Sequence, residues 1–130
     1  MTKTIPTIAV FPEERLTLDQ KIEKWVWQLC RTLEQNYQLR YPNNPSPIKF
    51  RMKFGKKYIK VIQQDEILQR GGYCDGGVHA FVDKKTGQVY KPASYKAPAK
   101  HVRYDLRLIS DRSRCYQNAD WAGGYLYLRG

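Results

Sequence analysis

Long apolar runs are missing from this chain of 130 residues, and its mean hydropathy is −0.68. A helix needs about 20 mostly apolar residues to span a membrane, so the sequence excludes a membrane span. The first residues, MTKTIPTIAVFPEER, hold one lysine and a short apolar patch before a proline and two glutamates, which is not the pattern of a signal peptide. We therefore expect a protein that stays inside the cell.

Cysteine and histidine are scarce. The three cysteines form no CxxC pair and are odd in number, so we expect no disulfide framework and a reducing compartment. Cys30 falls on the apolar side of a helical pattern and is expected in the core. A zinc site could be drawn from Cys74, His79, His101 and Cys115, but structural zinc sites usually contain closely spaced ligand pairs, which these are not. We therefore expect no metal.

Motifs for nucleotide cofactors are also absent. Glycine pairs at 71–72 and 76–77 enclose three residues and predict a tightly turned loop. Such loops can bind phosphates, but the chain contains neither GxGxxG nor GxxxxGK followed by Ser or Thr. We therefore expect no cofactor. Because the sequence also lacks a recognisable catalytic motif, an enzyme is not our main expectation.

Basic side chains are in excess, and they gather in the middle of the chain. Lysine and arginine number 23 against 12 acidic residues, a net charge of +11. Residues 48–104 alone hold thirteen basic and four acidic side chains, a net +9. One basic region on a folded domain is typical of polyanion binding, because each phosphate that a cation neutralises releases a counterion. We favour nucleic acid over plain solubility, and over a membrane surface because no amphipathic basic helix is visible.

A long amphipathic helix is predicted near the N-terminus. Residues 1–15 are interpreted as an extended arm, and Thr17 and Gln20 have the spacing of a capping box, with Thr17 at the N-cap. Apolar residues then recur every three or four positions, which predicts a helix over 17–40. A run of prolines follows and ends the helix.

The basic region, residues 48–109, predicts several strands. Its first segment alternates cationic and apolar residues, which is the period of a half-buried strand. A hairpin turn is expected at 83–87, with its glycine in the left-handed conformation. The predicted strands are 48–54, 57–63, 78–83, 88–91 and 101–109, with a short connector at 65–69.

The last part of the chain, residues 110–130, predicts a short helix and a final strand. Asp111 is expected to cap the helix, a glycine pair ends it, and 125–129 alternates as a strand. Together these elements predict one α+β domain over 1–130, in which the long N-terminal helix packs on a mostly antiparallel sheet of four to six strands.

The segment 77–103, GVHAFVDKKTGQVYKPASYKAPAKHVR, resembles a segment of small uncharacterised proteins of tailed bacteriophages, cyanophages among them. Their shared pattern is roughly VHxFVDxxTGDVYKPASWKAPAK before a basic stretch. Gln88 stands where the pattern has Asp, and Tyr95 stands where it has Trp. The match covers about a fifth of the chain. It implies a phage accessory protein, in the host-cell cytoplasm or packaged in the virion, and it implies no mechanism.

Two segments are candidates for binding nucleic acid. The first is the cationic row in the alternating segment 48–54, for which an ordinary solvated sheet face is the alternative. The second is the segment 91–103, whose two prolines limit its freedom and whose cations and aromatic ring could contact phosphates and bases. A core position is the alternative for its tyrosine. The candidate residues are Lys49, Arg51 and Lys53 in the row, and Lys91, Tyr95, Lys96, Lys100, His101 and Arg103 in the second segment.

The two histidines define an enzymatic alternative. Strand alternation places His79 on the same side as Phe81, which favours a half-buried structural histidine with its hydrogen bonds satisfied. A metal-independent ribonuclease would use His79 or His101 as the general base and a Lys, Arg or Tyr to stabilise the phosphate.

The sequence as a whole predicts a non-catalytic phage accessory protein that binds DNA or RNA through a basic surface with low sequence specificity. Two alternatives from other classes stay open: a structural component of the virion, and an inhibitor that docks on a host protein. The small ribonuclease ranks below both. We expect no cofactor, no metal and no membrane partner, and the oligomeric state is open.

Overall fold

The computed structural model describes residues 12–45, 47–67 and 71–127. Within these ranges the chain forms one sheet of five antiparallel strands in the order β1-β2-β3-β4-β5, together with two α-helices. The α+β prediction is confirmed. The elements are η1 (Glu13–Arg15), α2 (Leu18–Arg40), β1 (Lys49–Phe54), β2 (Tyr58–Glu66), β3 (Tyr73–Asp83), β4 (Gln88–Tyr90), β5 (Tyr104–Asp105), α3 (Ile109–Asn118) and η2 (Gly124–Leu126).

The long helix α2 begins where its capping residues predict. The Thr17 hydroxyl accepts a hydrogen bond from the Gln20 backbone N–H at 3.2 Å, and the Gln20 side chain accepts one from the Thr17 N–H at 3.0 Å. These two bonds satisfy N–H groups that the first turn of a helix leaves without partners. The predicted helix 17–40 and its capping box are confirmed.

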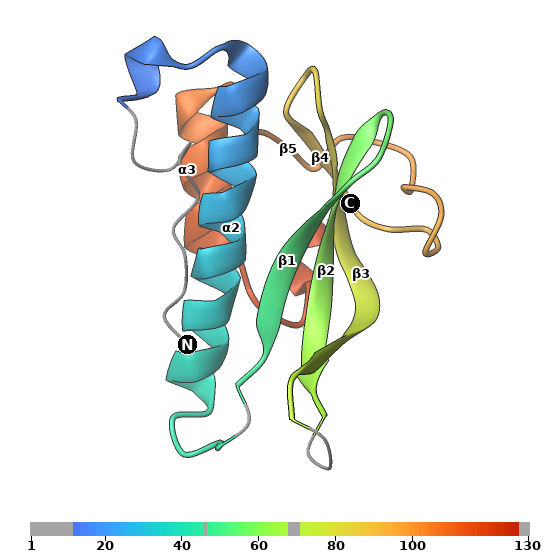
Figure 1. Ribbon diagram of the computed structural model, residues 1–130. Helices are drawn as coiled ribbons and strands as arrows, with labels where there is room; N and C mark the ends of the chain where they lie inside the picture. The colour runs from blue at the N-terminus through green and yellow to red at the C-terminus, as the bar shows by residue number, and fades with distance from the viewer. Residues whose placement is uncertain (1–11, 46, 68–70, 128–130) are drawn as a thin grey trace.

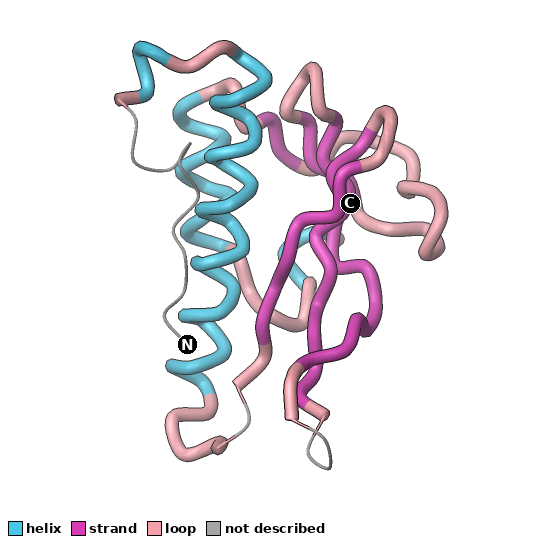
Figure 2. Tube along the Cα trace, viewed as in Figure 1, coloured by secondary structure: helices cyan, strands magenta, loops and turns pink. Residues whose placement is uncertain are grey.

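The sheet has two different faces. Figures 1 and 2 show both helices on one side of the sheet and the loop between β4 and β5 on the other. The helices cover their face with the apolar stripe of α2, which meets apolar side chains of the strands in a single cluster. Fully buried members of this cluster include Ile22, Leu29, Leu33, Phe50, Val61 and Val82. We call the side without helices the outer face.

Two polar side chains of α2 hold the edge strand β1 in place. The Glu34 carboxylate accepts from the Phe50 N–H at 2.9 Å, and the Arg31 guanidinium donates to the Phe50 carbonyl at 2.8 Å. A strand at the edge of a sheet exposes unpaired backbone groups on its open side. At Phe50 these groups are satisfied by the helix, which fixes how α2 lies against the strand.

The strands β2 and β3 are longer than the sequence predicts. The expected connector at 65–69 is wrong at its start, because Asp65 pairs with Cys74 and continues β2. The expected loop at 71–77 is wrong from Tyr73 onward, because β3 begins there. A Cβ at Gly76 would lie only 3.1 Å from the Gln63 carbonyl oxygen. The glycine therefore allows two strands to approach closely, and it does not mark a loop.

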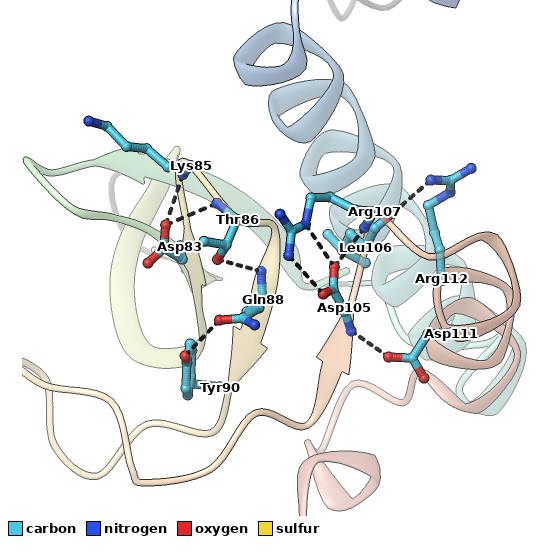
Figure 3. Close-up of polar contacts among 10 residues, drawn as sticks. All are labelled: Asp83, Lys85, Thr86, Gln88, Tyr90, Asp105, Leu106, Arg107, Asp111 and Arg112. Carbon is cyan, nitrogen blue, oxygen red and sulfur yellow. Dashed lines mark hydrogen bonds and ion pairs between the residues drawn. The ribbon is translucent and has the colours of Figure 1, made fainter.

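The hairpin turn at 83–87 forms as predicted. The Asp83 carboxylate accepts from the backbone N–H groups of Lys85 and Thr86 (Figure 3), and Gly87 has φ of +71°. In the returning strand β4, the Gln88 side chain accepts a hydrogen bond from the Tyr90 hydroxyl at 3.2 Å. The residue that departs from the phage pattern at position 88 therefore orients the tyrosine two positions on.

The last third of the chain differs most from the prediction. Only Tyr104–Asp105 of the expected strand 101–109 forms a strand, flanked by backbone hydrogen bonds from Arg103 to Val89 and from Leu106 to Gly87. His101, with φ of +74°, departs from the extended conformation that was expected. Asp111 does not cap α3; the helix begins two residues earlier, and this carboxylate instead accepts from the Asp105 N–H (Figure 3).

Both ends of the chain also depart from the extended structure that was predicted. At the end of the described chain, η2 replaces the start of the expected strand 125–129; Tyr127 follows it with extended backbone, and 128–129 lie outside the described residues. Near the N-terminus, the expected arm 1–15 contains the 3₁₀ turn η1, and residues 1–11 are likewise outside the described part.

Replacing the capping threonine tests how much of the fold depends on α2. Thr17→Ala removes the hydroxyl acceptor, and we expect a loss of about 1 kcal/mol of folding stability, seen as a fall of a few degrees in the thermal unfolding midpoint by circular dichroism. Thr17→Ser keeps the acceptor and is the control, expected to unfold close to the parent protein. Equal midpoints for Ala and Ser would contradict this role for the cap.

Candidate functional site

The cationic row of β1 lies on the outer face. Phe50 points into the core, so its neighbours Lys49 and Arg51 project to the opposite side, as does Lys53. Each cation meets a different partner there. This placement agrees with the alternation in the sequence, and the partners decide which of the three remain available to a ligand.

Arg51 is neutralised by a carboxylate. Its Nε donates to Asp75 Oδ1 at 2.7 Å, and a second N–H group of the guanidinium donates to the other oxygen. The Gln64 amide also donates to Asp75 at 3.0 Å. The guanidinium beside Asp75 lowers the pKa of that carboxyl to about 2, so the pair stays ionised at neutral pH. Arg51 therefore organises the outer face more than it adds free positive charge.

Lys53 has a like charge opposite it. Its partner across the β1–β2 ladder is Lys60, and directly opposed cations destabilise a sheet. The Lys53 ammonium lies 5.7 Å from the centre of the Tyr95 ring, and that of Lys60 lies 4.3 Å from it. Across residues 12–45, 47–67 and 71–127, neither ammonium has an ion pair with a carboxylate. The two lysines thus form a positive site beside one aromatic ring, with no salt bridge to a carboxylate among the described residues, although Lys53 contributes to the lowered pKa of Asp75.

Tyr95 brings the loop 91–103 into contact with the cationic row of β1, two segments whose relative position the sequence does not predict. It comes from the loop 91–103, and its ring reaches the lysines of β1 and β2 while 45% of the residue stays accessible. The core alternative for Tyr95 is therefore wrong. Farther along the face, Lys49 lies 4.0 Å from the centre of the Tyr73 ring. We call this surface the basic face; it consists of Lys49, Arg51, Lys53, Lys60, Tyr73 and Tyr95.

The other cations of the loop have three different environments. Lys96 and Lys100 are exposed on the loop. Lys91 turns elsewhere: its ammonium donates to the Pro92 carbonyl at 3.4 Å and lies 4.7 Å from the centre of the Tyr127 ring. Arg103 is used internally, because its guanidinium donates to three backbone carbonyls, those of Lys100, His101 and Leu126.

The loop conformation depends on this use of Arg103. His101 is exposed and adopts the left-handed region, φ +74°, which costs free energy for a residue with a Cβ. Its carbonyl is one of the three that Arg103 binds. Among the predicted site residues, His101 and Arg103 therefore shape the loop, and their side chains are not part of the basic face.

Lys60 and Tyr73 were missed by the sequence analysis. Lys60 stands between Ile59 and Val61, which are both buried, so strand alternation alone assigns it to the outer face. In the predicted strand 57–63 each side carries a lysine, so the alternation did not show clearly which side faces solvent. Tyr73 was placed in a loop, and only its pairing with Glu66 shows that it belongs to the sheet.

Comparison with protein families gives one match. A family model matches residues 10–128. The chain belongs to DUF7717, a family of unknown function. The DUF7717 match spans the whole basic face and the loop 91–103, so both lie within the family's domain. No curated protein and no solved structure matches the chain.

The described residues hold neither a cluster of metal ligands nor a membrane-spanning helix. Over the described ranges, no three His, Cys, Asp or Glu side chains are grouped so as to hold a metal ion. Nor is any helix in that part of the chain both long and apolar enough to cross a bilayer. Cys30 and Cys115 are buried in the core, as expected for Cys30, and burial raises the pKa of each thiol to about 12.

His79 belongs to the core rather than to the basic face. Val61 pairs with Ala80 while Ile62 pairs with Val78, so His79 is the extra residue of a β-bulge. The bulge turns its ring toward the core, where the ring centre lies 5.2 Å from that of Phe50 and Nε2 lies 2.8 Å from the Tyr125 hydroxyl.

The expected alignment of His79 with Phe81 is therefore wrong. Phe81 packs against Tyr58 on the outer face, with ring centres 5.7 Å apart. His79 is buried rather than half-buried as predicted, and the Tyr125 hydroxyl is the hydrogen-bond partner of its Nε2.

The burial of His79 predicts a pH dependence of stability. Desolvation lowers the pKa of His79 from 6.5 to about 4, with the Asp120 carboxylate opposing the shift. As the pH falls below about 6.5, the unfolded chain binds a proton that the folded chain does not, so stability decreases toward pH 4, by about 3 kcal/mol in all. Urea unfolding at pH 7, 6 and 5 measures this slope.

The second histidine supplies the control. His79→Gln cannot titrate and should flatten the slope between pH 7 and 5, although it lowers stability at every pH. His101→Gln removes an exposed imidazole and should keep the slope of the parent protein. The assignment fails if His79→Gln retains the full slope.

Proposed function

We propose that this protein binds single-stranded nucleic acid through the basic face, without catalysis and with low sequence specificity. The observation that carries the proposal is the pair Lys53 and Lys60, opposed across the ladder without an acidic partner among the described residues, under the accessible ring of Tyr95. A phosphate placed at this pair would remove the repulsion and release counterions.

The aromatic ring favours a single strand over a duplex. Base–aromatic stacking needs an unpaired base, and it is tolerant of sequence because every base has a π-face. The loop that carries Tyr95 projects from the sheet (Figure 1), and Lys96 and Lys100 are exposed on the same loop. In this arrangement the lysines bind phosphates and the ring stacks on a base.

The phage resemblance adds a biological setting to this proposal. The loop that carries Tyr95 is the part of the chain that resembles small phage proteins, and position 95 is aromatic in their pattern as well. We therefore propose an accessory protein that acts on nucleic acid in an infected host cell. The exposed loop and the basic face support this role, and they also suggest the variants that test it.

Salt-dependent binding tests the lysine pair. A labelled single strand of about 12 nucleotides and the matching duplex are titrated by fluorescence anisotropy at several salt concentrations. The logarithm of the affinity should fall linearly with that of the salt, and Lys53→Gln/Lys60→Gln should make the slope for the single strand shallower by about 1.4, roughly 0.7 for each lost phosphate contact.

The control for charge is a matched pair on the helix. Lys21→Gln/Lys24→Gln on α2 removes the same charge from the other side of the sheet, and it should leave the slope close to that of the parent protein. Equal slopes for both double variants would show that the change in salt dependence comes from net charge and not from the position of Lys53 and Lys60. Absence of binding to strand and duplex at low salt would overturn the proposal and leave an acidic protein surface as the partner of these lysines.

Substitutions at position 95 test the stacking role. Tyr95→Ala should weaken single-strand binding by roughly 5- to 100-fold, as expected for the loss of one stacked base. Tyr95→Phe keeps the ring and should bind like the parent protein, and Tyr95→Trp, which restores the residue of the phage pattern, should bind more tightly. The same anisotropy assay measures all three, and unchanged binding by the Ala variant would exclude stacking at this position.

A further inference from the structure

A cavity of about 330 Å³ lies beside the open part of β3. The strand β4 pairs only with Phe81 and Val82, so the earlier residues of β3 have no strand on that side within the described chain. The cavity is lined there by Gly77 and His79, and its opposite wall comes from the C-terminal segment 121–127. Its volume is at the lower end of the range for small-molecule sites, which suits a single nucleotide.

The walls of the cavity combine aromatic rings with one cation. Trp121 and Tyr127 both line it. The Trp121 backbone N–H donates to Asn36 at 3.0 Å, and its ring meets that of Tyr37 edge-on with centres 5.3 Å apart, so the indole is held in place by α2. Lys91, also in the lining, keeps its ammonium 4.7 Å from the centre of the Tyr127 ring.

Neutral hydrogen-bonding groups complete the lining. His79 binds the Tyr125 hydroxyl through Nε2, which leaves Nδ1 on the side of Gly123. Gly123 has φ of +85°, and a Cβ there would lie 3.7 Å from the imidazole, so the glycine leaves space in front of the ring. Gln63 contributes an amide whose nitrogen donates to Asp65 at 3.3 Å and which can still accept through its oxygen. Open strand residues of β3 also offer backbone N–H and C=O groups to a ligand.

We infer that this cavity binds one unpaired nucleobase, with Trp121 and Tyr127 as its aromatic walls, His79 and Gln63 at its polar edge, and Lys91 on the attached phosphate. A planar aromatic ligand with mixed donors and acceptors and one anionic group matches this lining. The inference rests on the proposed function in one respect, since the base would come from a strand held on the basic face. The loop 91–103 connects the two sites, because it starts at the cavity with Lys91 and Pro92 and carries Tyr95 to the basic face.

The test uses the full chain labelled with 5-fluorotryptophan and observed by ¹⁹F NMR. The chain has three tryptophans, and the Trp121→Phe variant assigns the signal of Trp121. The four ribonucleoside 5′-monophosphates are added one at a time, with ribose 5-phosphate as the control that lacks a base. We expect at least one nucleotide to shift the Trp121 signal saturably, without shifting Trp25 or Trp27, and ribose 5-phosphate to have no effect.

Two variants separate occupancy of the cavity from general charge. Gly77 lines the cavity, and a Cβ added to it would meet no atom within 4 Å, so Gly77→Val adds bulk at the cavity wall and should weaken or abolish the shift. Lys91→Gln should weaken monophosphate binding by roughly tenfold, from loss of a charged hydrogen bond, and leave nucleoside binding unchanged. Lys85→Gln, in the exposed turn between β3 and β4 and outside the lining of the cavity, is the control and should bind like the parent protein.

The same samples distinguish failure of this inference from failure of the proposed function. If an oligonucleotide binds and no nucleotide moves the Trp121 signal, the cavity is not a base site, and the basic face stands. If a nucleotide moves the signal in the parent protein and in Lys53→Gln/Lys60→Gln, but no oligonucleotide binds, the cavity is a mononucleotide site and the proposed function is wrong. If ribose 5-phosphate moves the signal as strongly as the nucleotides, the base is not recognised, and the inference is overturned.

Discussion

Burial of the apolar stripe of α2 against one side of the sheet is the constraint on which the rest of the structure depends. The helix covers that side with Ile22, Leu29 and Leu33, and it holds β1 through the bonds of Arg31 and Glu34 to Phe50. Because strand side chains alternate, the residues between the buried ones must lie on the other side. The chemistry of the outer face is therefore a consequence of how the core is filled.

The outer face keeps some of its charges unbalanced while it balances others. Arg51 has Asp75, and the two form a neutral pair. Lys53 and Lys60 face each other across the ladder and both lie near the Tyr95 ring, with Lys60 also near the Phe81 ring; such rings attract cations through their π-faces but remove no charge. Two lysines that repel each other in the free protein are preorganised for an anion, because an anion bound between them removes their repulsion.

The loop 91–103 is built to stay in one conformation. Pro92 and Pro98 form an isolated bridge across it, and Arg103 ties its end to the C-terminal turn through Leu126. The left-handed His101 is stable in this setting because its carbonyl is bound by Arg103. A loop that is already ordered loses less entropy when a ligand binds, so its exposed tyrosine and lysines can act as a preformed surface.

The bulge in β3 has two effects on the molecule. It turns His79 out of the alternation of the strand and into contact with Phe50 and Tyr125. It also leaves the neighbouring part of the strand beside the cavity, where β4 does not reach. Bulges of this kind commonly redirect a side chain next to a functional site. Here the redirected side chain is an imidazole whose second nitrogen lies on the cavity side.

The sequence by itself determined the elements that depend on near neighbours. The capping box at Thr17, the helix over 17–40, the alternation of 48–54 and the left-handed glycine of the turn at 83–87 all follow from local periodicity and local backbone preference. The excess of positive charge in the middle third was also visible there. These features need only residues within a few positions of one another.

The tertiary structure alone decided which of those charges are available. Arg51 is paired with a carboxylate 24 positions away, Lys60 is opposed to Lys53, and Tyr95 reaches both lysines from a loop that no strand period predicts. The bulge at His79 and the strand continuing past Asp65 depend on the register between β2 and β3. Register and long-range contacts are set by the packing of the whole core, so no local pattern in the sequence contains them.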